Sequence, residues 1–167
     1  SDKEKQYLRT VYMPNNFSNK ESGNMFSVLE KTLLLKSVNL FKNIPGDILS
    51  KIAQIAKEVE IGFDEKLFDQ GEQGDSLYII INGKISVTQN ERSITILGEG
   101  DCIGEMALLD QEPRSAGALA IVDSILLKID QEGFFELMST NPEIMKQIVM
   151  VLTQRVRDMN KKVTGSL

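Results

Sequence analysis

The chain has 167 residues, of which 41% are hydrophobic, and a formal net charge of −5. This length allows one folded domain with a sizeable core. The acidic balance argues against a surface that binds nucleic acid, and no apolar run approaches the ~20 residues of a membrane span. With no histidine and one cysteine, an internal disulfide, a histidine-bound metal or haem and a Ser/His/Asp triad are excluded. We therefore expect no enzymatic activity, no catalytic residues, no cofactor, no metal site and a cytoplasmic location.

Residues 1–27 are the first segment of the chain and contain the polar run NNFSNKESGN. Such a run has too few apolar side chains to form a core. We expect a polar linker or the end of an upstream region, with residues 7–12 as its frayed end. Because the chain begins with Ser1 rather than methionine, we also expect a piece of a longer protein. We assign residues 28–163 to one domain and residues 164–167 to a tail.

Two short helices are predicted next. The first has apolar residues at three-to-four spacing, namely Val28, Leu29, Leu33 and Leu34. Pro45 begins the second helix, because proline is favoured in a first helical turn. The apolar residues of the second helix are Ile48, Leu49, Ile52, Ile55 and Ala56.

After about Glu58 the apolar spacing changes to two, and glycine or asparagine interrupts the chain every few residues. Short strands with this punctuation predict a sandwich or barrel. The expected strands are residues 76–81, 84–89, 92–97, 113–120 and 124–129. The dipeptide Asn82-Gly83 favours a two-residue primed turn, which predicts that the first two of these strands pair as a hairpin.

Helical spacing returns after the strands. It begins with Phe134, Phe135, Leu137 and Met138, and Asn141-Pro142 then starts a longer helix. The longer helix has an apolar stripe of Ile148, Leu152, Val156 and Met159. The predicted fold class is α+β and mainly β: an antiparallel β-roll, or double-stranded jelly-roll barrel, flanked by N-terminal and C-terminal helices.

The segment GEMALLDQEPRSA, residues 104–116, places a carboxylate and a guanidinium close together among the short strands. Residues 105–109 can form little more than one helical turn, whose free N–H groups favour an anion. Arg114 and the hydroxyl of Ser115 return to the same place, and Glu105 can accept from a hydroxyl. A phosphate beside a sugar fits this set of groups. A simple ion pair between Glu105 and Arg114 is the alternative.

This segment, together with FDQGEQGDSLYIIINGKISV at residues 68–87, resembles the cyclic nucleotide-binding domain family. The resemblance covers roughly residues 38–160 and includes spaced glycines and a phosphate-binding cassette. It implies that Glu105 accepts from the ribose 2′-hydroxyl and that Arg114 pairs with the cyclic phosphate. Backbone N–H groups complete the implied ligand site, which consists of Gly104, Glu105, Met106, Ala107, Arg114, Ser115 and Ala116.

The resemblance implies a regulatory module that senses a cyclic nucleoside monophosphate and signals through its flanking helices. The recipient would be an attached effector domain outside this chain or a partner. Ser115, within Arg-Ser-Ala, favours cAMP over cGMP but leaves cGMP open. Arg155, Met159 and Asn160 on the last helix are candidates to face the base, and the same helix is a candidate homodimer contact. The alternative function is a structural or interaction domain with the same fold and an unused pocket.

Overall fold

The computed structural model describes residues 25–165, so most of the predicted linker and the end of the tail lie outside the described residues. Its helical elements are α2 (Val28–Ser37), α3 (Gly46–Ile55), the short 3-10 helix η1 (Glu105–Leu108), α4 (Gln131–Thr140) and α5 (Pro142–Thr164). Its strands are β1 (Lys57–Ile61), β2 (Lys66–Phe68), β3 (Ser76–Asn82), β4 (Ile85–Gln89), β5 (Arg92–Leu97), β6 (Cys102–Ile103), β7 (Gly117–Ala120) and β8 (Ser124–Asp130).

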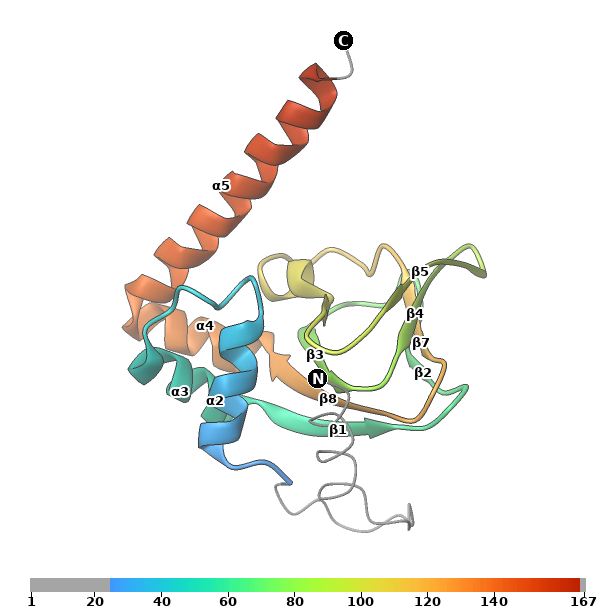
Figure 1. The fold of residues 1–167 in the computed structure, drawn as a ribbon, viewed down its shortest axis with the longest axis horizontal. Helices are drawn as coiled ribbons and strands as arrows, with labels where there is room; N and C mark the ends of the chain where they lie inside the picture. The colour runs from blue at the N-terminus through green and yellow to red at the C-terminus, as the bar shows by residue number, and fades with distance from the viewer. Residues whose placement is uncertain (1–24, 166–167) are drawn as a thin grey trace.

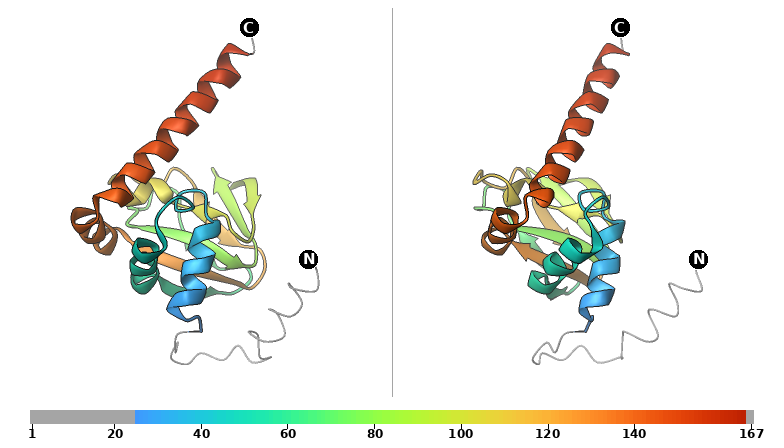
Figure 2. Two further views of the ribbon diagram at one scale, coloured as in Figure 1. Left: turned by 60° about the vertical axis from the view of Figure 1, so that its left-hand side comes forward. Right: turned by 90° about the vertical axis from the view of Figure 1, so that its left-hand side faces the viewer.

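The strands form two four-stranded antiparallel sheets, in the orders β1-β8-β3-β6 and β2-β7-β4-β5. Figures 1 and 2 show helices α2, α3 and α4 gathered at one side of the strands. This arrangement confirms the predicted mainly-β fold with flanking helices. It is a roll of two open sheets rather than a closed barrel.

Buried hydrophobic side chains form two clusters, one on each face of the sheet that contains β3. Successive residues of a strand point to opposite faces, so Ile79 joins the first cluster and Ile80 the second. The first cluster lies under the helices and includes the predicted helix residues Ile48, Leu49 and Ile52. The second lies between the sheets and consists of Ile61, Phe68, Ile80, Ile85, Ile103, Ala118, Ala120 and Leu126.

The predicted hairpin at Asn82-Gly83 is wrong. β3 pairs with β8 and β6, whereas β4 pairs with β5 and β7, so the chain passes from one sheet to the other at this dipeptide. Because β3 has neighbours on both edges, it has no edge left for β4. Gly83 has φ 111°, and a Cβ at this residue would lie 2.0 Å from Ser124 Oγ. This close packing on the start of β8 requires glycine at the crossing.

The two-residue hairpin turn lies instead between β4 and β5. Gln89 pairs with Arg92, and the intervening Asn90 and Glu91 have φ angles of 50° and 63°. Positive φ at both central residues is the pattern of a type I′ turn, whose twist matches that of the paired strands.

The strand predicted over residues 113–120 is shorter than expected, because β7 covers only Gly117–Ala120. Pro113 makes an isolated bridge to Gln73. The backbone N–H of Arg114 donates to Glu72 O at 2.7 Å, and the backbone carbonyl of Arg114 accepts from the Gly71 N–H at 2.8 Å. These bonds hold the beginning of the predicted strand against the loop after β2 instead of in the sheet.

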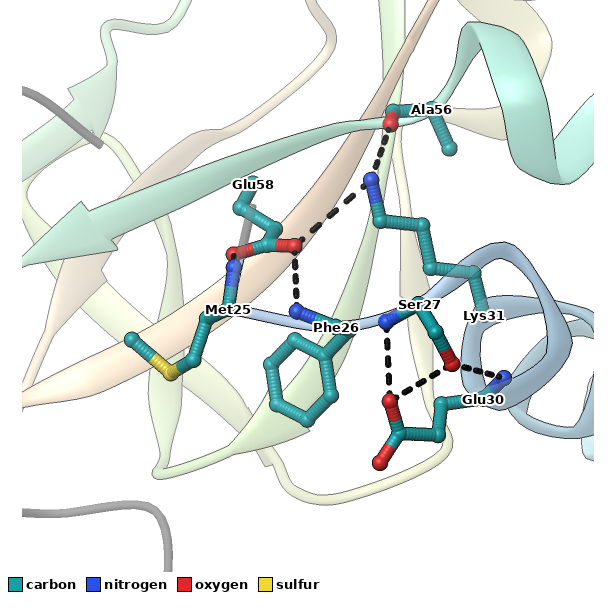
Figure 3. A network of polar contacts seen from close by, with 7 residues as sticks. All are labelled: Met25, Phe26, Ser27, Glu30, Lys31, Ala56 and Glu58. Atoms are coloured by element: carbon teal, nitrogen blue, oxygen red, sulfur yellow. Dashed lines mark hydrogen bonds and ion pairs between the residues drawn. The ribbon is translucent and has the colours of Figure 1, made fainter. Parts of the chain in front are cut away.

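A buried carboxylate fixes the beginning of the described chain to β1, as Figure 3 shows. Glu58, with a side chain only 6% exposed, accepts from the backbone N–H groups of Met25 at 2.7 Å and Phe26 at 2.8 Å. Lys31 Nζ lies 3.5 Å from the Glu58 carboxylate and donates to Ala56 O at 3.0 Å. The charged groups of this cluster therefore satisfy one another inside the protein.

Helix α2 buries a different face from the one that its apolar residues suggest. Its buried residues are Lys31 and Leu35. Of the predicted apolar residues, Val28, Leu29 and Leu33 are exposed, and Leu34 is half-buried against the core. Lysine is rarely buried unless it is paired. Here Lys31 is paired with the end of α3 and with β1, and Leu35 packs in the first cluster.

Helix α5 projects beyond the rest of the described chain in all views of Figures 1 and 2. Its buried residues, Ile144, Ile148 and Val151, all lie in its first half. Pro142 is its first residue, as predicted from Asn141-Pro142. Within residues 25–165, no helix combines the length and the apolar character that crossing a membrane requires.

Candidate functional site

The segment between the end of β5 and the start of β7 forms the candidate site. The Gly98 N–H donates to Asp101 Oδ2 at 2.9 Å, and Gly100 has φ 84°, so the chain bends before β6. Gly104 follows β6 in the left-handed region, with φ 76°, and precedes η1. η1 covers Glu105–Leu108, which confirms the predicted single short turn. We call residues 98–116 the cassette.

Two glycines lie directly against the guanidinium of Arg114. A Cβ at Gly104 would lie 2.0 Å from Arg114 Nη1 and 3.0 Å from Ser76 O, and a Cβ at Gly74 would lie 3.0 Å from Arg114 Nε. Gly104 is therefore required both for its positive φ and for this close approach. At both places the edge of the guanidinium is bordered by backbone.

Arg114 is a buried cation with unused donors. Its side chain and backbone together are 8% exposed, and Nη2 donates to Ser76 O at 2.9 Å. Nε and Nη1 are also buried, and neither has a hydrogen-bond partner within residues 25–165. One face of the guanidinium lies over the Phe68 ring, with Cζ 4.0 Å from the ring centroid, and the Tyr78 centroid is 5.9 Å from Cζ.

Burial lowers the pKa of Arg114 below its ordinary value, because the charged form loses its water. Tyr78, Asp75 and Glu72 oppose this effect with smaller contributions. Arginine nevertheless stays protonated in proteins. A buried N–H group without a partner costs about 1–3 kcal/mol. An anion that reached Arg114 would therefore find a full charge and free donors.

Glu105 pairs with an arginine of α5, and among the described residues no ion pair joins it to Arg114. Both of its carboxylate oxygens accept from Arg155, Oε1 from Nη1 and Oε2 from Nη2. The hydrogen bond to Glu105 raises the pKa of Arg155. The alternative in which Glu105 and Arg114 neutralise each other is therefore wrong for this structure. The two charged groups of the cassette have different neighbours.

The other predicted cassette residues lie around these two groups. Met106 and Ser115 are exposed, and Ala116 is half-buried. Ala107 is buried, and its N–H donates to Gly104 O at 3.1 Å within η1. In this structure the Ala107 N–H is thus engaged by the backbone.

The three predicted residues of α5 lie in two different places. Arg155 reaches the cassette, but its contact is the carboxylate of Glu105. Met159 and Asn160 are exposed on the part of α5 that follows its last buried residue, Val151. The structure does not bring these two side chains to the cassette, so their contact with a base stays a prediction.

Three further residues at the site had no assigned role in the sequence analysis. Gln131 Nε2, at the start of α4, donates to Ala107 O at 3.0 Å and to Asp110 O at 2.9 Å, which joins the end of η1 to the helical layer. Phe68 and Ser76 contact Arg114. Both belong to the segment FDQGEQGDS, and its resemblance to the family was the only feature of the sequence that pointed to a role for them at the site. Nothing near Gln131 in the sequence indicates its role.

Cys102 offers no reactive thiolate beside the cassette. Burial raises its pKa to about 12, with a further contribution from the nearby Glu105 carboxylate. The thiol therefore stays protonated near neutral pH. Within the described part of the chain, no group of His, Cys, Asp and Glu residues is arranged to hold a metal ion.

The family model of the cyclic nucleotide-binding domain matches residues 58–141, which include the whole cassette. The chain therefore belongs to the cyclic nucleotide-binding domain family. A domain of this family is a regulatory module and not a catalytic one.

Relatives of this chain include both cAMP-linked and cGMP-linked proteins. The CRP-like cAMP-activated global transcriptional regulator of Mycobacterium tuberculosis is 28% identical over 132 residues, which cover 76% of this chain and 59% of the regulator. A cGMP-dependent protein kinase of Drosophila melanogaster is 37% identical over 118 residues, 66% of this chain and 13% of the kinase. The Thermus thermophilus catabolite activator protein has a TM-score of 0.64 at 27% identity, over 75% of this chain and 62% of that chain. The chain thus spans only part of each relative.

Proposed function

We propose that the chain is a regulatory module that binds a cyclic nucleoside monophosphate, prefers cAMP to cGMP, and signals through its flanking helices to an attached domain or partner. The main support for ligand binding is the buried guanidinium of Arg114, whose Nε and Nη1 have no hydrogen-bond partner among the described residues. A phosphate anion would supply the missing charge and acceptors. Glu105, at the start of η1, would accept from the ribose 2′-hydroxyl.

Binding measurements with cAMP and cGMP test this proposal. The named relatives comprise a cAMP-activated regulator and a cGMP-dependent kinase, so our preference for cAMP rests on Ser115 within Arg-Ser-Ala. We expect saturable binding of cAMP, and weaker binding of cGMP, by titration calorimetry. If equilibrium dialysis detects neither nucleotide at about millimolar concentration, the alternative function, an interaction domain with an unused pocket, is favoured. The proposal places the module in the cytoplasm, where its free Cys102 would stay reduced.

A cAMP analogue without the 2′-hydroxyl is expected to bind less well than cAMP, because Glu105 would lose the donor that it accepts from. Hydrogen bonds to charged groups contribute about 1.5–3 kcal/mol. In Glu105→Gln the difference between the two nucleotides should shrink, because an amide oxygen accepts more weakly than a carboxylate. Glu112→Gln changes an exposed carboxylate of the same loop and should keep the full difference. Equal affinity of the parent for both nucleotides would remove Glu105 from the site.

Helix α5 is the element through which we propose that the signal leaves the pocket. Arg155 engages both carboxylate oxygens of Glu105, so a ribose hydroxyl must share or replace this ion pair. A ligand shifts an equilibrium only when it makes different contacts in the two states. The Glu105–Arg155 pair supplies such a contact. After Val151 the described part of α5 has no buried residue, and the pair joins that half of the helix to the cassette.

A second copy of the chain is the partner that we propose for the exposed face of α5. Seven large apolar residues of this helix are exposed, and all but Met150 alternate at intervals of four and three, as in a coiled-coil seam: Met145, Val149, Leu152, Val156, Met159 and Val163. Valine alternates with leucine or methionine along the seam. Because β-branched residues at one seam position and leucine at the other favour two parallel helices, the sequence suits a dimer. Arg155 directly precedes Val156, so the ion pair with Glu105 lies beside this seam.

Hydrogen exchange is expected to slow in residues 150–162, as well as in the cassette, when cAMP binds. The reason is that the ligand would hold α5 and the cassette in one packed arrangement, and local opening is what exchange reports. Measurements at low and high protein concentration separate this effect from the dimer seam, because only protection at the seam rises with concentration. Protection confined to the cassette would contradict transmission through α5.

A further inference from the structure

The guanidinium of Arg114 lies against two aromatic rings, those of Phe68 and Tyr78. Its Cζ lies 4.0 Å from the Phe68 centroid and 5.9 Å from the Tyr78 centroid. The two rings are 6.0 Å apart and inclined at 35° to each other. Arginine stacks favourably on such ring faces, because the negative face of the ring attracts the cation. Phe68 is the nearer of the two rings and belongs to the core cluster between the sheets.

The edge of the same guanidinium is nearly free of partners. Nη2 donates to Ser76 O, but Nε and Nη1 have no acceptor among residues 25–165. Gly74 and Gly104 border this edge and have no side chains that could accept from it. Phe68 thus compensates the charge from the face and occupies none of the N–H groups.

A carboxylate in the place of Phe68 would behave differently. It would accept from the N–H groups of Arg114 and would have to be displaced before an anionic ligand could bind. The ring needs no displacement, because a phosphate approaches the edge of the guanidinium and the ring covers its face. The burial of the stacked cation also reduces its contact with water, which strengthens its interaction with an anion.

We propose that Phe68 is a positioning residue for the phosphate site: its ring holds the Arg114 guanidinium in place and leaves Nε and Nη1 without a competing acceptor. This inference rests on the proposed function, in which Arg114 binds the cyclic phosphate. It assigns to Phe68 a role in ligand affinity in addition to its packing in the core.

The proposal is tested by measuring the cAMP affinity of three variants of the full chain. Phe68→Leu removes the ring face, and we expect about 5- to 20-fold weaker binding. Phe68→Tyr retains the ring face and should keep most of the affinity. Ile85→Ala is the matched control, because it removes the same number of carbons from the same core cluster. It leaves Phe68, Tyr78 and Ser76, which contact the Arg114 guanidinium, unchanged. It should lower the thermal stability and leave the affinity within about twofold.

A double-mutant cycle separates positioning from a general structural effect. In an Arg114→Gln background no cation stacks on the ring, so Phe68→Leu should change the residual cAMP affinity less than about twofold. An equal loss from Phe68→Leu in both backgrounds, or full affinity of Phe68→Leu with the native arginine, would overturn the inference and leave the proposed function intact. Failure of the parent to bind cAMP would overturn both.

Discussion

Replacing Arg114 with alanine is expected to weaken cAMP binding by about 2–5 kcal/mol, because the bound phosphate would lose its cation in a partly desolvated site. No other cation of the cassette can substitute, since residues 98–116 contain no further lysine or arginine. The fold should survive, because two of the buried nitrogens of Arg114 have no partner among the described residues. Calorimetry of the variant with cAMP measures the loss, and thermal unfolding checks the fold.

Arg92→Ala is the matched control for this experiment. Arg92 is exposed on β5, so its removal changes the net charge by the same amount without touching the cassette. We expect this variant to bind cAMP as the parent does. If Arg114→Ala binds within about threefold of the parent, a difference below 1 kcal/mol, Arg114 is not the phosphate ligand.

Replacing Glu58 with alanine is expected to lower the free energy of unfolding by about 3–5 kcal/mol, because it leaves a buried ammonium without its anion. The Glu58 carboxylate is also the acceptor for the N–H groups of Met25 and Phe26. These donors lie beside the buried Lys31. Urea unfolding, followed by circular dichroism, measures the change.

Two further variants show whether this loss comes from the buried charge. Lys66→Ala removes an exposed ion pair with Asp69 and should leave the unfolding free energy unchanged. The double variant Lys31→Met, Glu58→Leu removes both buried charges and should be more stable than Glu58→Ala. Stability of Glu58→Ala within about 1 kcal/mol of the parent would show that the cluster in Figure 3 contributes little.

The helices and most strands could be predicted from the sequence, because their signals are local. Periodicity and proline locate α3 and α5 within a residue or two. The partner of a strand is not a local property. Asn82-Gly83 favours a turn in either arrangement, but the neighbours of β3 are β6 and β8, which come later in the chain. Because β6 and β8 occupy both edges of β3, the predicted hairpin with β4 does not form.

The chemistry of the candidate site was only partly visible in the sequence. Glu105 and Arg114 lie in one short segment, so their roles could be proposed from their types and from the family resemblance. Arg155 is 50 residues from Glu105, and no local pattern indicates their contact. Phe68 looks like an ordinary core residue because its contact with Arg114 depends on how β2 and the cassette pack.

Lys31 shows a limit of the same kind in the fold. A lysine in an amphipathic helix is expected on the solvent face, and the four apolar residues Val28, Leu29, Leu33 and Leu34 suggested another face for the core. The buried acceptors at Ala56 and Glu58 reverse that expectation. Such a reversal depends on tertiary contacts, which a helical pattern does not contain.

A crystal structure of the chain with cAMP tests the central claim most directly, because it locates the phosphate relative to Arg114. We predict phosphate oxygens about 2.7–2.9 Å from nitrogens of the Arg114 guanidinium, and the ribose 2′-hydroxyl within hydrogen-bond distance of Glu105. A nucleotide whose phosphate lies elsewhere, with Nε and Nη1 of Arg114 still without acceptors, would contradict it.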